Sequence, residues 1–202
     1  MKLITYLKKS FALFLLIPVI SFSQEKNVLI RIIQDESAFR LNEFQTNVTL
    51  KNKAFKFQIA FDEMEGVYVF ASITDSVYRF TETSRIDDFS YLNLLELREG
   101  DKFNINKELN ISETGWSYWF YNETKPYHSF NRATVGIGDK GIVCSKVIRQ
   151  LYHTETEQII KLKNITTPLY LFFIAVKDYD ANGKPLTELL RRKVKIEWVN
   201  DN

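Results

Sequence analysis

The sequence is poor in the residues that build covalent or metal-held frameworks. Its 202 residues include one cysteine, two histidines, seven glycines and four prolines. A single cysteine excludes an intrachain disulfide, and so little glycine and proline excludes collagen-like and low-complexity chains. His128 and His153 form no metal-spaced pair, and the sequence contains no H-E-x-x-H, G-x-S-x-G or C-x-x-C motif. We therefore expect the stability of the chain to come from a packed core, and we expect neither a cofactor nor a metal site of these types.

Long hydrophobic runs are also missing after the first 23 residues. That opening segment places Lys2, Lys8 and Lys9 before an apolar run over residues 11–20, and small polar residues follow. This order is typical of a secretory signal peptide. The run is half of the ~20 residues that a membrane-spanning helix needs. We expect residues 1–23 to be a signal peptide, with an uncleaved anchor as the alternative, and the mature chain to be exported to the periplasm or the exterior without a transmembrane segment.

An excess of charge of one sign is missing as well. Without the three leader lysines, 24 basic residues face 25 acidic residues. Binding to phosphate backbones needs a basic excess, so we expect no nucleic-acid partner. The 45% hydrophobic and 14% aromatic content excludes a disordered chain.

What the chain does have is a succession of strand patterns. Phe55, Phe57, Ile59 and Phe61 alternate with more polar residues, which predicts a half-buried strand. Residues 67–73 are apolar on both faces and predict a central strand. Further strands are expected at 28–33, 48–50, 77–80, 91–97, 102–106, 116–121, 130–135, 159–162, 170–176 and 192–198.

Roughly ten to thirteen such strands predict an all-β fold, an antiparallel β-sandwich of immunoglobulin-like or jelly-roll-like type with at most one or two short helices. The last 35 residues resemble the closing hairpin of immunoglobulin-like sandwiches, with strand patterns at 170–176 and 192–196 around a glycine-containing turn. A helix remains the alternative for residues 84–99 and 142–152. We expect residues 24–202 to form one domain, and two small β domains, 24–110 and 111–202, are the alternative.

Two glycine-containing motifs resemble ligand loops. Residues 136–141 satisfy G-x-G-x-x-G, but the strand–helix context of a nucleotide site is missing, so a hairpin loop is expected. Asp178, Asp180 and Asn182 reproduce the opening of a calcium loop. The twelfth position, which should be a bidentate glutamate, is Leu189. We therefore expect a solvated turn, with calcium binding as the alternative.

The densest aromatic stretch covers residues 116–121 and is followed by Tyr127. On a strand, residues 116, 118 and 120 share one face, and Trp119 and Tyr121 share the other. One face is expected to fill the core, because large rings dominate cores. The other face packs under a loop or forms an exposed platform. If this face is an exposed platform, Trp119, Tyr121 and Tyr127 are the candidate ligand-binding residues.

No pattern in the sequence selects a catalytic centre. Cys144 lies in an apolar stretch and is expected to be a small buried hydrophobe. The charged side chains of residues 191–193 and Lys195 are expected on the solvated face of a last strand, where they discourage pairing with another strand edge. The leading hypothesis is an exported, non-catalytic binding or adhesion module with a protein or glycan ligand at the cell envelope. A carbohydrate-active hydrolase that uses a carboxylate pair, or a structural subunit of an envelope complex, is the alternative.

Overall fold

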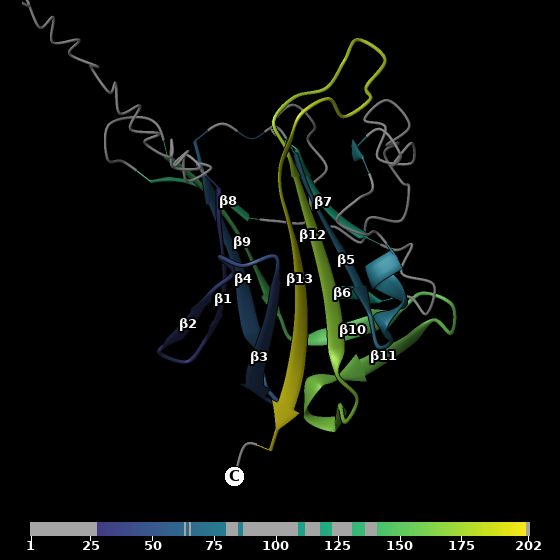
Figure 1. The fold of residues 1–202 in the computed structure, drawn as a ribbon. Helices are drawn as coiled ribbons and strands as arrows, with labels where there is room; N and C mark the ends of the chain where they lie inside the picture. The colour runs from purple at the N-terminus through teal and green to yellow at the C-terminus, as the bar shows by residue number, and fades with distance from the viewer. Residues whose placement is uncertain are drawn as a thin grey trace, which may run out of the picture.

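The computed structural model of the chain has an all-β fold (Figure 1). It describes residues 28–62, 64, 66–79, 85–86, 109–111, 118–122, 131–135 and 141–200. The helical elements in this part of the chain are two short 3-10 segments, η1 (Asp75–Arg79) and η4 (Leu162–Asn164). The predicted all-β class is thus confirmed, and the immunoglobulin-like or jelly-roll-like type stays a prediction.

The first five-stranded sheet, sheet A, is built around the strand with the clearest alternation, β4 (Phe55–Phe61). Every second residue of β4 is buried, because successive side chains of a strand point to opposite faces. The strand order is β2-β1-β4-β9-β8. The partners of β4 in this sheet are β1 (Val28–Gln34), β2 (Ser37–Arg40), β8 (Asn131–Val135) and β9 (Gly141–Ile148).

The second five-stranded sheet, sheet B, contains the predicted central strand as β5 (Gly66–Ser72), in which every residue is buried. The strand order is β3-β13-β12-β5-β7. The other four strands are β3 (Gln45–Lys51), β7 (Tyr118–Asn122), β12 (Leu169–Val176) and β13 (Glu188–Val199). β3 runs parallel to β13, and the remaining pairs are antiparallel.

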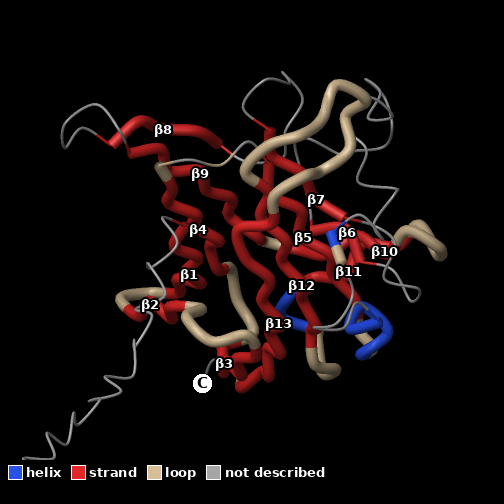
Figure 2. Tube along the Cα trace, turned by 45° about the horizontal axis from the view of Figure 1, so that its top comes forward, coloured by secondary structure: helices blue, strands red, loops and turns tan. Residues whose placement is uncertain are grey.

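A small third sheet, sheet C, joins β11 (Gln158–Lys161), β10 (Gln150–His153) and β6 (Leu109–Ile111). β6 pairs with β10 in parallel. Figures 1 and 2 place this sheet beside the β5 side of sheet B. Residues 142–152 therefore belong to two strands, β9 and β10, and the helix alternative for them is wrong.

Sheets A and B pack against each other around the main apolar core. Phe57 of β4 meets Phe173 of β12 with ring centroids 5.6 Å apart and perpendicular planes. Cys144 of β9 is fully buried in this core, as expected for a small hydrophobe. Both sheets combine strands from before and after residue 110. The two halves of the chain thus share one hydrogen-bonded framework.

A second apolar cluster covers part of the outer face of sheet B. Tyr68 of β5 and Phe172 of β12 are fully buried there, and Val77 of η1 packs over them. Residues 77–80 were predicted as a strand, which is wrong for residues 77–79 because they belong to η1. Of the segment 84–99, the structure describes residues 85–86 alone, and the strands expected at 91–97 and 102–106 lie outside the described residues.

Candidate functional site

The aromatic strand predicted as a binding platform is β7, the last strand of sheet B in the described part of the chain. Its register pairs Trp119 with Val69 and Tyr121 with Val67 of β5. Paired residues share one face of a sheet, and both valines belong to the main core. Trp119 and Tyr121 therefore hold register positions on the face of sheet B that is directed toward sheet A. Tyr127 lies outside the described residues, and ligand contact by the three aromatics stays a prediction.

The candidate calcium segment forms the turn between β12 and β13. The Asp180 carboxylate accepts hydrogen bonds from the backbone N–H groups of Asn182 (2.9 Å) and Lys184 (2.7 Å), as in an Asx turn. Gly183 has φ 76°, which glycine adopts without steric cost. Within the described ranges, no group of three His, Cys, Asp or Glu side chains is placed to hold a metal ion. The observed contacts are those of a turn, and they add no ligand set to the calcium alternative.

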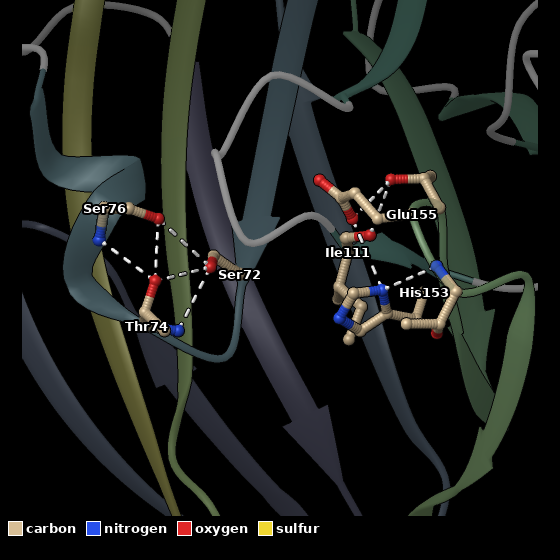
Figure 3. Close-up of polar contacts among 8 residues, drawn as sticks. Ser72, Thr74, Ser76, Ile111, His153 and Glu155 are labelled. Atoms are coloured by element: carbon tan, nitrogen blue, oxygen red, sulfur yellow. Dashed lines mark hydrogen bonds and ion pairs between the residues drawn. The ribbon is translucent and has the colours of Figure 1, made fainter.

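Hydroxyl groups cluster where β5 leads into η1 (Figure 3). The buried Oγ of Ser72 accepts the backbone N–H of Thr74 at 3.0 Å and lies 3.3 Å from the Oγ of Ser76. The hydroxyls of Thr74 and Ser76 are 2.7 Å apart. Hydroxyl-to-backbone bonds of this kind compete with the strand ladder and favour a helical turn. The cluster therefore accounts for the point where β5 ends and η1 begins.

The second polar cluster of Figure 3 surrounds His153, which is 5% exposed at the end of β10. Its Nδ1 accepts the backbone N–H of Thr156 at 3.4 Å and lies 3.3 Å from a carboxylate oxygen of Glu155. The Thr154 hydroxyl hydrogen-bonds to the carbonyl of Ile111 (3.1 Å) and to Glu155 (3.0 Å). The Thr154 bond connects the β10–β11 turn to β6, whereas the contacts of His153 with Thr156 and Glu155 lie within the turn.

A polar surface on the outer face of sheet B is the best candidate for ligand contact. There β3 and β13 lie side by side (Figure 1). Alternate residues of β13, Val194 and Ile196, point into the main core, so the residues between them point outward. The β3–β13 face, as we name this surface, consists of the partly or fully exposed residues Gln45, Asn47 and Thr49 and their register partners Lys193, Lys195 and Glu197.

Lys193 lies between two aromatic rings at one end of this face. Its Nζ is 5.1 Å from the ring centroid of Phe44 and 5.3 Å from that of Tyr78, within the ~6 Å range of a cation–π interaction. The backbone N–H of Lys193 donates to the carbonyl of Phe44 at 2.6 Å, which fixes Phe44 beside β13. Tyr78 also meets Tyr170 edge to face at 5.6 Å. We name Phe44, Tyr78, Tyr170 and Lys193 the cation–aromatic cluster.

The Tyr78 ring keeps its neutral form in this cluster. Burial, followed by the neighbouring Tyr170 and Asp75, raises the pKa of the Tyr78 phenol well above its usual range. The hydroxyl is buried and finds no hydrogen-bond partner among the described residues. The neutral ring therefore offers its π-electrons to the Lys193 ammonium over the whole physiological pH range.

Carboxylates compensate the two other cations on the outer side of β13. Glu188 accepts two hydrogen bonds from Arg191, at 2.6 and 2.7 Å, and Arg191 is 8% exposed. Glu197 accepts a hydrogen bond from Lys195 at 2.6 Å, which raises the pKa of Lys195. In the described part of the chain no carboxylate lies within ion-pair distance of Lys193. Among these residues, the contacts of its ammonium are with the rings of Phe44 and Tyr78.

The prediction that residues 191–193 and Lys195 lie on a solvated face holds for the partly exposed Lys193 and Lys195, and it is wrong for Arg191, which is buried. β13 lies between β3 and β12, so the expectation that these charges protect a free edge is wrong. The alternation of Lys193 and Lys195 with buried residues was the available signal for an outward face. Phe44 and Tyr78, however, are distant in sequence from Lys193, and their position depends on the parallel β3–β13 pairing and on η1. No local pattern reports such contacts.

Comparison of the chain with models of known protein families gives no match, and comparison with curated proteins gives none either. In the part of the chain that the structure describes, no helix has the length and apolarity needed to cross a membrane.

Proposed function

We propose that the chain is an exported, non-catalytic binding or adhesion module of the cell envelope or exterior, with a protein or glycan as its ligand. The order of charged, apolar and small residues in 1–23 supports export. The observation that carries the binding function is the cation–aromatic cluster, in which Lys193 is held by Phe44 and Tyr78 beside an exposed polar sheet face.

The backbone of the β3–β13 face makes it suitable for binding. β13 is hydrogen-bonded on both sides, to β3 and to β12, so the backbone that carries its outward side chains is held in place. A ligand that meets groups already held in place loses less affinity to ordering them. Amides, an ammonium and aromatic rings together offer hydrogen bonds, charge and apolar contact to one ligand.

The aromatic strand β7 is a second proposed contact region, and Trp119→Ala tests it. The register favours a core position for Trp119, which predicts a loss of stability of about 3–5 kcal/mol and an unchanged affinity of the remaining folded chain. Contact with the ligand predicts the opposite, a weaker affinity at unchanged stability. Urea unfolding and ligand binding, measured on the same preparations, separate the two roles.

The proposed function is tested with the chain recovered after export through its own leader. Wild-type protein is applied to a glycan array and to solubilised envelope fractions, next to the double variant Gln45→Ala/Asn47→Ala. Both amides are exposed, so their removal should leave the fold intact. We expect the wild type to retain a ligand and the variant to bind it about thirtyfold more weakly, because each of the two lost hydrogen bonds costs ~1 kcal/mol and about 1.4 kcal/mol is tenfold.

The matched control is Gln158→Ala/Asn164→Ala, which removes two exposed amides from β11 and η4. It should bind as the wild type does. Recovery of the protein from the cytosol with residues 1–23 still attached would contradict export. A wild type that retains nothing from either source, or turnover of a retained glycan, would contradict a non-catalytic binding module.

A further inference from the structure

We infer that the ligand of the β3–β13 face is an acidic polysaccharide, whose carboxylate or sulfate groups contact Lys193. This inference rests on the proposed function and adds the chemical class of the ligand. Three properties of the face support it: one cation that pairs with no carboxylate of the described residues, amide groups beside that cation, and a partly exposed aromatic ring.

The cation that pairs with no carboxylate in the ranges that the structure describes is Lys193. Arg191 and Lys195 on the same side of β13 are paired with Glu188 and Glu197, so an incoming anion would have to displace a carboxylate at either of them. At Lys193 the anion would meet an ammonium that contacts two neutral rings. Rings attract a cation without cancelling its charge. They also restrict the flexible lysine side chain before an anion arrives. Less conformational entropy of that side chain is then lost on binding.

The amides lie at the register positions beside the cations. Gln45 pairs with Lys193 and Asn47 with Lys195, and neighbouring strands are about 4.8 Å apart. Each amide supplies hydrogen-bond donors and an acceptor, which is what sugar hydroxyl groups require. Tyr170 pairs with Lys195 on the other side and is half-buried, so part of its ring can contact the apolar face of a sugar. An anion site with hydroxyl and ring contacts around it matches a sugar that carries one acidic group.

The charge distribution favours an acidic polysaccharide over a nucleic acid. Double-stranded DNA carries a charge about every 1.7 Å along its axis, and tight binding neutralises many of them. Among the described residues, the β3–β13 face offers one cation that no carboxylate pairs with, and residues 24–202 are close to neutral. A polymer with sparse charges and many hydroxyl groups fits this pattern better.

The test compares the exported wild type with Lys193→Met, which keeps the aliphatic bulk and removes the charge, and with Lys193→Arg, which keeps the charge. The probes are polygalacturonate, dextran sulfate of low substitution, uncharged dextran and double-stranded DNA, measured by calorimetry at low and high salt. We expect the wild type to bind at least one of the two acidic polymers and to bind dextran much more weakly. Lys193→Met should weaken this binding about tenfold, and Lys193→Arg should restore most of it.

The matched control is Lys161→Met, which removes an exposed lysine from β11 of sheet C and should bind as the wild type does. Preference for polygalacturonate or for dextran sulfate identifies the acidic group. The inference is overturned if neither acidic polymer binds, if dextran binds equally well, or if Lys193→Met and Lys161→Met have equal effects while both melt as the wild type does. It is also overturned if double-stranded DNA binds better than both acidic polymers. Retention of a neutral glycan or a protein would leave the broader proposed function standing.

Discussion

At the scale of single residues, one buried polar side chain connects the ends of the two large sheets. Gln34 at the end of β1 is 7% exposed. Its side-chain amide donates to the carbonyls of Lys51 (3.0 Å) and Lys53 (3.1 Å) and accepts the N–H of Lys51 at 2.7 Å. β1 belongs to sheet A, and Lys51 ends β3 of sheet B. The side chain thus ties sheet A to the backbone of the connection that leaves sheet B.

Replacing Gln34 by Ala should lower the free energy of unfolding by about 2–3 kcal/mol, because the hydrogen bonds of this buried amide to Lys51 and Lys53 are lost. Urea unfolding measures the change. Gln158→Ala, at an exposed position of β11, is the control and should stay within about 0.5 kcal/mol of the wild type. Equal stability of the two variants would show that solvent replaces the Gln34 bonds without loss.

Tyr78 predicts a specific dependence of stability on pH. Because burial raises its pKa in the folded state, its contribution is fully present below the phenol pKa of the unfolded chain, about 10, and is lost as the pH rises toward the folded value. The wild type should therefore lose more stability between pH 9 and 11 than Tyr78→Phe does. At pH 7 the variant should be at least as stable, because it lacks the buried unpaired hydroxyl. Parallel pH profiles in urea unfolding would refute this account of Tyr78.

At the scale of elements, alternation and burial could be predicted where they follow from local sequence. The phenylalanines of β4 and the doubly buried β5 were recognised because their patterns are complete within seven residues. η1 was mistaken for a strand because Val77 and Tyr78 are strand-forming residues, whereas the hydroxyl contacts of Ser72 with residues 74–76 decide the local structure. β2 and β6 were missed because Ser37–Arg40 and Leu109–Ile111 are too short to show a period.

The turn between β12 and β13 depends on one backbone conformation. At Gly183, with φ 76°, Gly183→Ala should cost about 1–2 kcal/mol, because a side chain with a β-carbon is disfavoured in the left-handed region. Gly183→Asn is the comparison and should cost less, since asparagine tolerates this region. Thermal melting of both variants tests the order. A loss that is equal for alanine and asparagine would show that the φ angle is not the cause.

At the scale of the whole molecule, the pairing of distant strands determines both the core and the candidate site. The parallel pair of β3 and β13 brings residues 45–51 beside residues 193–199. No local sequence pattern indicates such a pairing, because the sequence shows which side chains of a strand alternate and not which other strand lies beside it. The sequence therefore predicted the outward lysines of β13, and it could not predict their neighbours Phe44, Gln45 and Tyr78.

Shared sheets also predict that the described halves of the chain unfold together. Phe57→Ala in sheet A and Phe173→Ala in sheet B should each cost about 3–5 kcal/mol and lower one common transition, because the two rings are in contact. The double variant should cost less than the sum, since the same contact is lost once. Fluorescence and circular dichroism during urea unfolding should report coincident transitions. Two separated transitions, or strict additivity, would show that the sheets are energetically independent.

The central claim is that ligand contact takes place on the β3–β13 face, and a nuclear magnetic resonance titration tests it most directly. Isotope-labelled protein without residues 1–23 is titrated with short oligomers of whichever acidic polymer binds, while backbone and side-chain amide signals are followed. The account predicts that the largest shifts occur at Gln45, Asn47, Lys193 and Lys195, with saturation at one common ligand concentration. Saturating shifts confined to β7 or to sheet A, with these four residues unchanged, would contradict it.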